Sequence, residues 1–322
     1  MRIFQVDAFT KERFTGNPAT VVLDADQDSD ATLAAIAREF AHAETAFVLR
    51  PDAADHDIRL RFFNARKEAA FVGHATVAAH AVLLSAKLRT AGTLRQKSGT
   101  GIIEVVAAGV PAAGVPAAGE PATGEPGAGG AANRLPGAGP AAFVEFRQTA
   151  PTLDPELPPD AIARVARALG LADDQVDARL PARIARKGST RLLIAVSGTH
   201  ALNRLKPNFD ALMSVGKELG AEGFFAFCAV RDDAGPRTYS RMFCPALGIA
   251  EDPVSGNAHA MLAAHLLNLK VLKPEDQRFV GHQGEQMRRP GIVHVALEIE
   301  RGQMLAARIG GHAVIVSDGR LV

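Results

Sequence analysis

An internal repeat limits the folds open to this chain more than any other sequence feature. Residues 61–84 and 241–267 share one order: Arg-x-Phe, a polar loop, Gly-x-Ala and an apolar run that ends in Leu-Leu. In each copy the leucine pair begins ten residues after the glycine, which is Gly73 in the first copy and Gly256 in the second. A strand that leads into a glycine-initiated helix, used twice, predicts two related half-molecules.

The helices of both copies are predicted to be buried. In 75–84 and 258–267 almost every residue is Ala, Val, Leu, Met, Thr or His. A helix that is apolar on nearly all sides is buried on nearly all sides. Each helix is therefore expected at the centre of a sheet, and its bare N-terminal N–H groups, with the helix dipole, would bind an anion. We expect both N-termini to face one interdomain cleft.

The other elements favour an α+β fold in which a bent antiparallel sheet surrounds each central helix. Apolar residues at helical spacing predict amphipathic helices at 31–41, 160–169 and 208–219. Alternating and apolar runs predict the strands, without regular β-α-β alternation. The predicted strands are 3–9, 20–23, 44–49, 58–63, 102–106, 143–147, 192–196, 224–230, 238–243, 292–299 and 313–316.

The predicted halves are separated by a repetitive segment. At 322 residues the chain has room for two domains. Within 109–140, a five-residue Gly/Pro/Ala-rich repeat covers 109–128 and has no large apolar side chain beyond two valines. We interpret 109–142 as a flexible insertion or linker, with a Pro-rich ligand for a partner domain as the alternative. The halves are then 1–108 and 143–322, with the last strand a candidate to return to the first half.

Composition excludes several classes of function. Lysine plus arginine total 36 against 35 acids, and this balance argues against nucleic acid or an anionic membrane as a partner. No apolar run reaches the length of a membrane span, and the start lacks a signal-peptide pattern. Cys228 and Cys244 offer no disulfide framework, so we expect a cytoplasmic protein.

Glu44 is the first candidate for chemistry. It stands where the helix 31–41 has ended and a strand begins, between apolar neighbours. A carboxyl group held there would be desolvated, which raises its pKa and suits it to proton transfer near neutral pH. The alternative is a solvated loop acid.

His74 follows the first helix-start glycine directly. Its imidazole would donate a hydrogen bond to a substrate or relay a proton, or it would serve as a polar helix-start residue. The remaining helix histidines, His80, His259 and His265, are expected to be core or surface residues. The pairs 74/80 and 259/265 lie six residues apart, which places the two rings of each pair on different helix faces and predicts no metal site.

The loop 248–257 is the third candidate. Glu251 and Asp252 precede the second helix, where the helix dipole favours acids. The functional alternative is that Asp252 orients the site while Ser255, Gly256 and Asn257 present donors to an anion.

Several motifs, taken in order, resemble the PhzF family of isomerase-like proteins, which share the diaminopimelate epimerase fold. The resemblance covers almost the whole chain. It includes the runs Phe14-Thr15-Gly16-Asn17-Pro18, Ala43-Glu44-Thr45-Ala46-Phe47, Gly73-His74-Ala75-Thr76, Met242-Phe243-Cys244-Pro245, Glu251 to Ala258 and Gly281-His282-Gln283-Gly284.

The resemblance implies two similar domains, a homodimer, no metal or organic cofactor, and a site between the domains. It implies that Glu44 is the acid/base, that His74 and Asp252 support it, and that Gly73, Gly256 and Asn257 hold the substrate carboxylate. Val72 and Ser255 stand where related epimerases carry two catalytic cysteines, so racemisation by a cysteine pair is excluded. Asn257 replaces the serine of the phenazine enzymes, so their substrate is not carried over.

The leading hypothesis is therefore a cofactor-independent isomerase that moves a proton between carbons of a small cyclic or unsaturated carboxylic acid. One alternative is a one-base epimerase or dehydratase acting on a hydroxy- or amino-acid, with Ser255 assisting. Another is a carboxylate-binding protein of the same fold without turnover.

Overall fold

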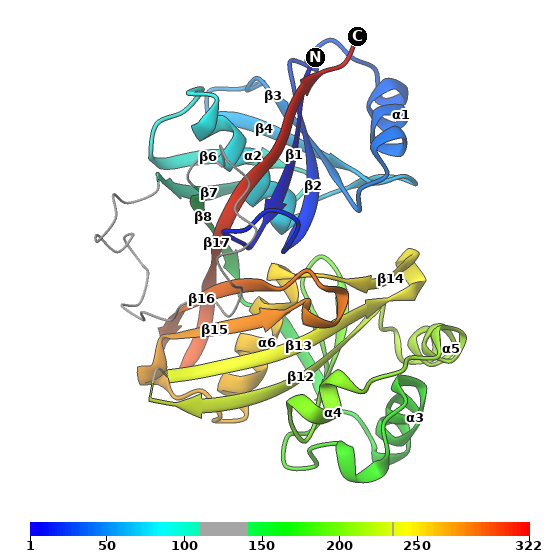
Figure 1. The fold of residues 1–322 in the computed structure, drawn as a ribbon. Coiled ribbons are helices and arrows are strands. Elements are labelled where there is room, and N and C mark those ends of the chain that lie inside the picture. The colour runs from blue at the N-terminus through cyan, green and yellow to red at the C-terminus, as the bar shows by residue number, and fades with distance from the viewer. Residues whose placement is uncertain (110–140, 234) are drawn as a thin grey trace. The chain divides into compact units, whose positions relative to one another are not determined.

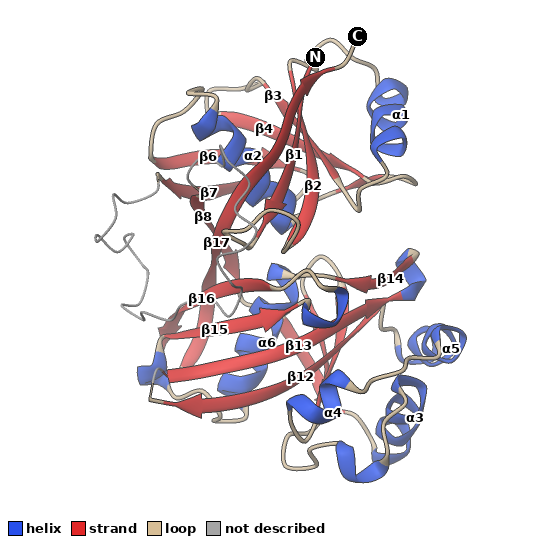
Figure 2. Cartoon of the chain, viewed as in Figure 1, coloured by secondary structure: helices blue, strands red, loops and turns tan. Residues whose placement is uncertain are grey.

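The computed structural model describes residues 1–109, 141–233 and 235–322, which form an α+β fold in two compact units. Unit 1 consists of Met1–Arg147 and Gly310–Val322, and unit 2 consists of Gln148–Ile309. Strands outnumber helices in both units (Figures 1 and 2). The predicted fold class is thus confirmed.

The units divide the chain at two long strands. β8 (Ala142–Thr149) pairs with β7 (Gly101–Ala108), so its residues up to Arg147 belong to unit 1. β17 (Gln303–Arg320) pairs along its second part with β1 (Arg2–Ala8), which places 310–322 in unit 1. The insertion predicted at 109–142 lies, from 110 to 140, outside the described residues.

The remaining elements of unit 1 include the buried helix α2. They are β2 (Asn17–Leu23), α1 (Asp30–Phe40), β3 (Thr45–Leu49), β4 (Ile58–Phe63), β5 (Glu68–Ala69), α2 (Gly73–Ser85) and β6 (Gly92–Ser98).

Unit 2 repeats this order of elements and adds one strand and two helices to it. Its elements are β9 (Thr152–Glu156), α3 (Pro159–Leu169), β10 (Arg183–Arg186), β11 (Thr190–Ala195), α4 (Thr199–Asn203), α5 (Phe209–Leu219), β12 (Gly223–Asp232), β13 (Gly235–Cys244), β14 (Ile249–Asp252), α6 (Gly256–Asn268), β15 (Arg278–Gln283) and β16 (Gly291–Glu300).

The strand pairings of the two units follow the same series. In unit 1, β2 and β3 are parallel, β3 and β4 antiparallel, β4 and β6 parallel, and β6 and β7 antiparallel. In unit 2, β11 to β12, β12 to β13, β13 to β15 and β15 to β16 show the same sequence of directions. The sheets are therefore mixed rather than purely antiparallel, because the connections that carry α1, α2, α5 and α6 are crossovers between parallel strands.

The two apolar helices lie buried, as the sequence predicted. α2 packs against β1, β2 and β3, and ten of its residues, from His74 to Leu83, are buried. α6 packs against β10, β11 and β16 and is buried from Ala258 to Leu267. His80, His259 and His265 are core residues, which settles the choice between core and surface.

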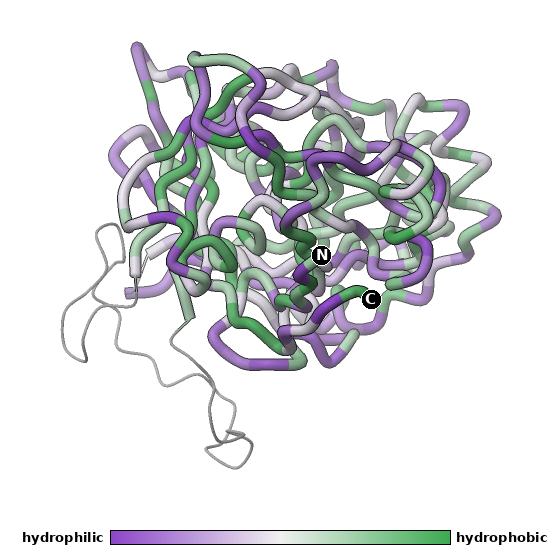
Figure 3. Tube along the Cα trace, turned by 90° about the horizontal axis from the view of Figure 1, so that it is seen from above, coloured by the Kyte–Doolittle hydropathy of each residue, from purple (hydrophilic) through white to green (hydrophobic). Residues whose placement is uncertain are grey.

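Amphipathic helices supply a second layer in each unit. Leu33, Ile36 and Ala37 of α1 pack in a cluster with Phe47 of β3 and Phe63 of β4. α3 and α5 pack together in unit 2 over a cluster from β10 to β13. The outer loops of the trace are largely hydrophilic (Figure 3). The two termini lie side by side, with the Leu321 N–H donating to the Met1 carbonyl at 3.0 Å.

Candidate active site

Glu44 lies at the entry to β3. α1 stops because Ala41 adopts a left-handed conformation with a φ of 52°, and four residues later β3 begins at Thr45. The Glu44 carbonyl accepts a hydrogen bond from the N–H of Thr20 on β2 at 3.3 Å, which fixes the backbone. The Glu44 side chain is only 14% exposed. It is therefore mostly desolvated, as its proposed chemistry requires, rather than a solvated loop acid.

His74 contacts Glu44 from the first turn of α2. The His74 Nε2 lies 3.4 Å from the Glu44 Oε2, and the His74 side chain is 9% exposed. This distance exceeds the usual 2.7–3.2 Å of an N–H···O hydrogen bond, and the Nε2 makes none in the described chain. A small movement of either side chain, or of a bound substrate, would complete the contact.

His74 is a neutral imidazole at pH 7. Burial lowers the pKa of His74 to about 4, and the nearby His42 lowers it further by a smaller amount. His42 itself is held by Thr20, whose Oγ1 lies 2.8 Å from the His42 Nδ1. The contact between Glu44 and His74 is thus not an ion pair, and a neutral ring can both donate and accept a proton.

The first turn of α2 has unpaired donors. Its N-cap residue Val72 offers no side-chain oxygen, and the first backbone hydrogen bond of the helix is donated by Thr76 to the Val72 carbonyl at 2.9 Å. Among the described residues the N–H groups of Gly73, His74 and Ala75 have no partner. These groups can bind a carboxylate.

Gly73 is needed at this start for a packing reason. A Cβ at position 73 would lie 2.9 Å from the Cζ of Phe146 on β8. Phe146 in turn contacts Phe71 edge to face, with ring centroids 5.2 Å apart. The Phe146 ring therefore occupies the space that a side chain at position 73 would need.

The start of α6 differs from the bare end that the sequence predicted. The Ser255 Oγ accepts a hydrogen bond from the Ala258 N–H at 3.3 Å and caps the helix. Serine is a favoured N-cap residue, and valine at position 72 is not. The prediction of two bare helix ends is therefore wrong for α6, where only the N–H groups of Gly256 and Asn257 lack a partner among the described residues.

The side-chain amide of Asn257 is occupied within unit 2. Its Oδ1 accepts from the Gln148 Nε2 at 2.7 Å, and its Nδ2 donates to the Ser189 Oγ at 2.9 Å and the Lys187 carbonyl at 3.4 Å. These partners come from β8 and from the turn between β10 and β11. The side chain therefore ties three segments together, and the backbone N–H is the group of Asn257 that is left to bind an anion.

Gln283 holds the loop that leads to α6, and the sequence reasoning gave it no role. Its Nε2 donates to the Asp252 carbonyl at 2.7 Å, and its Oε1 accepts from the Ser255 N–H at 3.1 Å. Its place in the Gly281-His282-Gln283-Gly284 motif was the available signal. The interpretation of Glu251 as a helix-dipole acid is also incomplete, since both its carboxylate oxygens accept hydrogen bonds from Arg241.

The predicted site residues thus form two sets, Glu44, Gly73 and His74 in unit 1 and Asp252, Ser255, Gly256 and Asn257 in unit 2. Across 1–109, 141–233 and 235–322 no three His, Cys, Asp or Glu side chains are grouped to hold a metal ion. No helix in these ranges has the length and apolar character needed to cross a membrane. Cys228 and Cys244 are free, as expected, and both are buried.

Comparison with known proteins gives consistent relatives. The phenazine biosynthesis-like protein family (PhzC-PhzF) matches residues 6–319. An isomerase of Escherichia coli K12, YddE, is 34% identical over 319 residues, which is 98% of this chain and 96% of that protein. The trans-2,3-dihydro-3-hydroxyanthranilate isomerase of Pseudomonas aeruginosa is 28% identical over 319 residues, or 99% of this chain and 98% of that one.

Solved structures agree in fold. The phenazine biosynthesis protein of the PhzF family from Bacillus anthracis superimposes with a TM-score of 0.80 at 25% identity, covering 100% of this chain and 99% of that chain. A hydroxyproline epimerase from Agrobacterium vitis shares the fold at a TM-score of 0.58 and 11% identity, covering 100% and 90%. These matches show that the chain belongs to the phenazine biosynthesis-like (PhzC-PhzF) family, a family of isomerases.

Proposed function

We propose that this isomerase moves a proton between carbons of a small cyclic or unsaturated carboxylic acid, with Glu44 as the acid/base. The observation that supports this most is the pair formed by the mostly buried Glu44 carboxyl and the neutral His74, whose Oε2 and Nε2 atoms lie 3.4 Å apart. A desolvated carboxyl beside a neutral imidazole can take a proton from carbon and return it.

The uncapped start of α2 indicates the class of substrate on which Glu44 and His74 would act. The N–H groups of Gly73, His74 and Ala75 and the positive end of the helix dipole favour an anion at the place where Glu44 and His74 meet. A substrate carboxylate bound there would also spread the negative charge that develops when an adjacent carbon loses its proton. His74 would donate a hydrogen bond from Nε2 without a change in its charge.

In unit 2 we propose supporting roles for the residues that the sequence indicated. The N–H groups of Gly256 and Asn257 would bind an anionic group, and Asp252 would be a supporting acid whose place is fixed by Gln283. Ser255 would act mainly through its cap of α6. The expected homodimer and cytoplasmic location stay predictions; light scattering measures the first.

Product analysis in D₂O tests the proposal. The first compound to try is trans-2,3-dihydro-3-hydroxyanthranilate, which the name of the P. aeruginosa relative specifies, followed by simpler cyclic and unsaturated carboxylic acids. An isomerase yields a product of unchanged composition with deuterium at a new carbon. Inverted optical rotation indicates an epimerase, and loss of water indicates a dehydratase. Thermal stabilisation by these acids without deuterium uptake or conversion would contradict the proposal.

A further inference from the structure

Each unit contains an arginine that lies over a phenylalanine of its own strand. In β4 the guanidinium carbon of Arg61 is 5.0 Å from the ring centre of Phe63. In β13 the corresponding atom of Arg241 is 5.0 Å from the ring centre of Phe243. These are the Arg-x-Phe segments of the internal repeat, so the repeat preserves a side-chain contact as well as a pattern. One face of each guanidinium is shielded from water by the ring.

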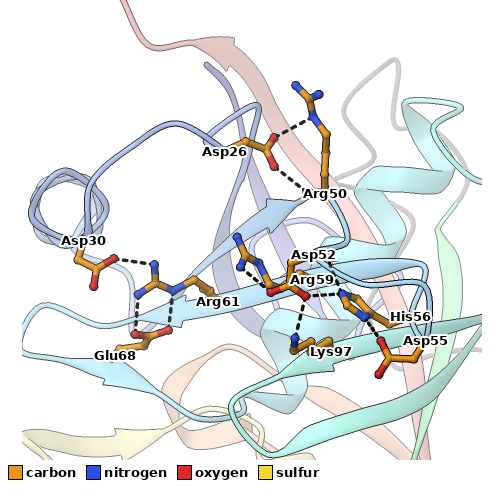
Figure 4. Close-up of polar contacts among 10 residues, drawn as sticks. All are labelled: Asp26, Asp30, Arg50, Asp52, Asp55, His56, Arg59, Arg61, Glu68 and Lys97. Carbon is orange, nitrogen blue, oxygen red and sulfur yellow. Dashed lines mark hydrogen bonds and ion pairs between the residues drawn. The ribbon is translucent and has the colours of Figure 1, made fainter.

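Both arginines bind a glutamate on the next strand in the same two-point geometry. The Arg61 Nε and Nη2 donate to the Glu68 Oε1 and Oε2 at 2.8 and 2.7 Å (Figure 4). The Arg241 Nε and Nη2 donate to the Glu251 Oε1 and Oε2 at 2.9 and 2.8 Å. Such fork-like pairing fixes orientation as well as distance.

The glutamates occupy the same place relative to the two central helices. Glu68 stands five residues before Gly73, and Glu251 stands five residues before Gly256, although the loop after the arginine is longer in unit 2. The strand register is also shared: Phe62 pairs with Ala69, and Met242 pairs with Asp252, each one residue beyond the arginine and the glutamate. In both units, the helix therefore begins the same number of residues after the glutamate of the ion pair.

The two pairs differ in their additional partners. Arg61 also donates to Asp30 of α1 at 2.7 Å, and together the two carboxylates raise the pKa of Arg61, with Glu68 the larger cause. Arg241 is buried and donates instead to the carbonyls of Leu202 and Leu205 at 3.3 and 3.2 Å. What the units share is only the arginine, the ring and the glutamate.

We propose that Arg61–Glu68 and Arg241–Glu251 are positioning pairs that set where α2 and α6 begin, and so hold the proton-transfer and anion-binding groups in place. This inference rests on the proposed function. Neither pair touches the reacting atoms. Each acts through the short segment that follows its glutamate, namely 69–72 before Gly73 and His74, and 252–255 before Gly256.

Unit 2 offers a matched control. Arg164 of α3 donates to both carboxylate oxygens of Glu218 on α5, at 2.6 and 2.9 Å. This pair is also a two-point contact, made through Nη1 and Nη2 rather than Nε and Nη2, but it joins two outer helices and precedes no predicted site residue. Its side chains are 37% and 56% exposed, so its loss should cost little.

The test compares Arg61→Lys with Arg164→Lys. Lysine keeps the charge but cannot make the two-point contact. In Arg61→Lys we expect kcat for deuterium uptake to fall on the order of 10- to 100-fold with a smaller change in KM, since an ångström-scale misplacement costs that much. NMR should also show the His74 pKa moving from about 4 toward its ordinary value as its packing loosens. Arg164→Lys should change neither quantity.

Arg241→Lys extends the test to unit 2. We expect the same loss of kcat, together with faster hydrogen exchange at the Ala258 and His259 amides, which donate to Ser255. If a lysine variant fails to fold, Glu68→Gln or Glu251→Gln breaks the same pair at nearly constant volume and is scored in the same way.

The outcomes separate this inference from the proposed function. If Arg61→Lys and Arg241→Lys behave like Arg164→Lys in kcat, in the His74 titration and in amide exchange, the positioning role is overturned. If instead no turnover depends on Glu44, the proposed function fails, while the His74 titration and the amide exchange still report on the two pairs.

Discussion

The helices α2 and α6 occupy the same place in their two units, but their first turns are completed in opposite ways. α2 begins after Val72 with no side-chain cap, beside Glu44 and His74. α6 begins after Ser255, which caps it, and the His259 Nδ1 lies 2.8 Å from the Ser255 carbonyl, which accepts its hydrogen bond. The duplicated backbone is thus left open to an anion in unit 1 and mostly closed by its own side chains in unit 2.

The acids that precede β3 and β12 show the same contrast. Glu44 and Glu222 each stand one residue before a strand that runs parallel to its predecessor. Glu44 is 14% exposed and contacts a buried histidine, whereas Glu222 is 49% exposed, accepts from the Thr190 N–H and lies 3.8 Å from Arg191. The contrast teaches that the duplication preserved the scaffold, and that the burial of one carboxyl distinguishes unit 1 from unit 2.

The largest expected effect is on acid stability. His74 has a pKa of about 4 in the folded chain and about 6.5 when unfolded, so protonation favours the unfolded state. Its contribution is fully present above about pH 6.5 and is lost as the pH falls toward 4, which amounts to about 3 kcal/mol. Urea unfolding between these pH values should show a shallower pH dependence in His74→Gln.

The same experiment on His259→Gln checks whether the two helix starts are equally dry, since burial also lowers the pKa of His259 to about 4. An unchanged slope in His74→Gln, with a reduced slope in His259→Gln, would mean that water reaches the α2 start.

The next effect concerns the two glycines that face aromatic rings. A Cβ on Gly281 would lie 2.1 Å from the His259 Cδ2, and one on Gly73 would lie 2.9 Å from the Phe146 Cζ. Because overpacking costs about 1–3 kcal/mol, we expect Gly281→Ala near the upper end and Gly73→Ala near the lower end. Calorimetric melting of both variants shows which substitution costs more. A larger loss of stability in Gly73→Ala than in Gly281→Ala would contradict the tighter packing of Gly281 against α6.

Removal of the α6 cap should cost less. Ser255→Ala deletes the oxygen that accepts from the Ala258 N–H, and the loss of such a cap costs about 1 kcal/mol. Denaturant unfolding of Ser255→Ala against wild type measures it. A neutral result would show that His259 and Gln283 hold the α6 start without the serine.

The smallest effect comes from giving α2 the cap that α6 has. Val72→Ser should stabilise the chain by less than about 1 kcal/mol, because the serine hydroxyl can accept a hydrogen bond from one of the unpaired N–H groups in the first turn of α2. The same hydroxyl would compete with a bound anion, so benzoate should bind more weakly by calorimetry. Stronger benzoate binding in Val72→Ser would argue against an anion at the open α2 start.

Much of the fold follows from sequence pattern because the pattern reflects burial. The apolar runs before Leu84 and Leu267 predicted α2 and α6, since nothing but a core can take a helix that is apolar all round. β17 was predicted only at 313–316 but spans Gln303–Arg320. Its Gly310-Gly311 and Ser317-Asp318-Gly319 stretches lack strand alternation, and pairing with β1 stabilises the second of them. Such pairing is not visible in a local window.

The sequence predicted which residues belong to the candidate site better than it predicted which residues they contact. Glu44 and His74 were identified separately, and the structure supplies the 3.4 Å between them. The engagement of the Asn257 amide depends on Gln148 and Ser189, which are far away in sequence. By contrast, the glutamate five residues before each helix-start glycine was visible in the repeat, and a closer alignment of the two copies would have found it.

The most direct test of the account compares Glu44→Gln with Glu222→Gln in the deuterium-uptake assay. The two substitutions remove the same charge at corresponding places in the two units. We expect Glu44→Gln to lower the rate on the order of 10²- to 10⁴-fold, the usual contribution of a general acid/base, and Glu222→Gln to leave it unchanged. Uptake that continues undiminished in Glu44→Gln would contradict the central claim that this buried carboxyl carries the proton.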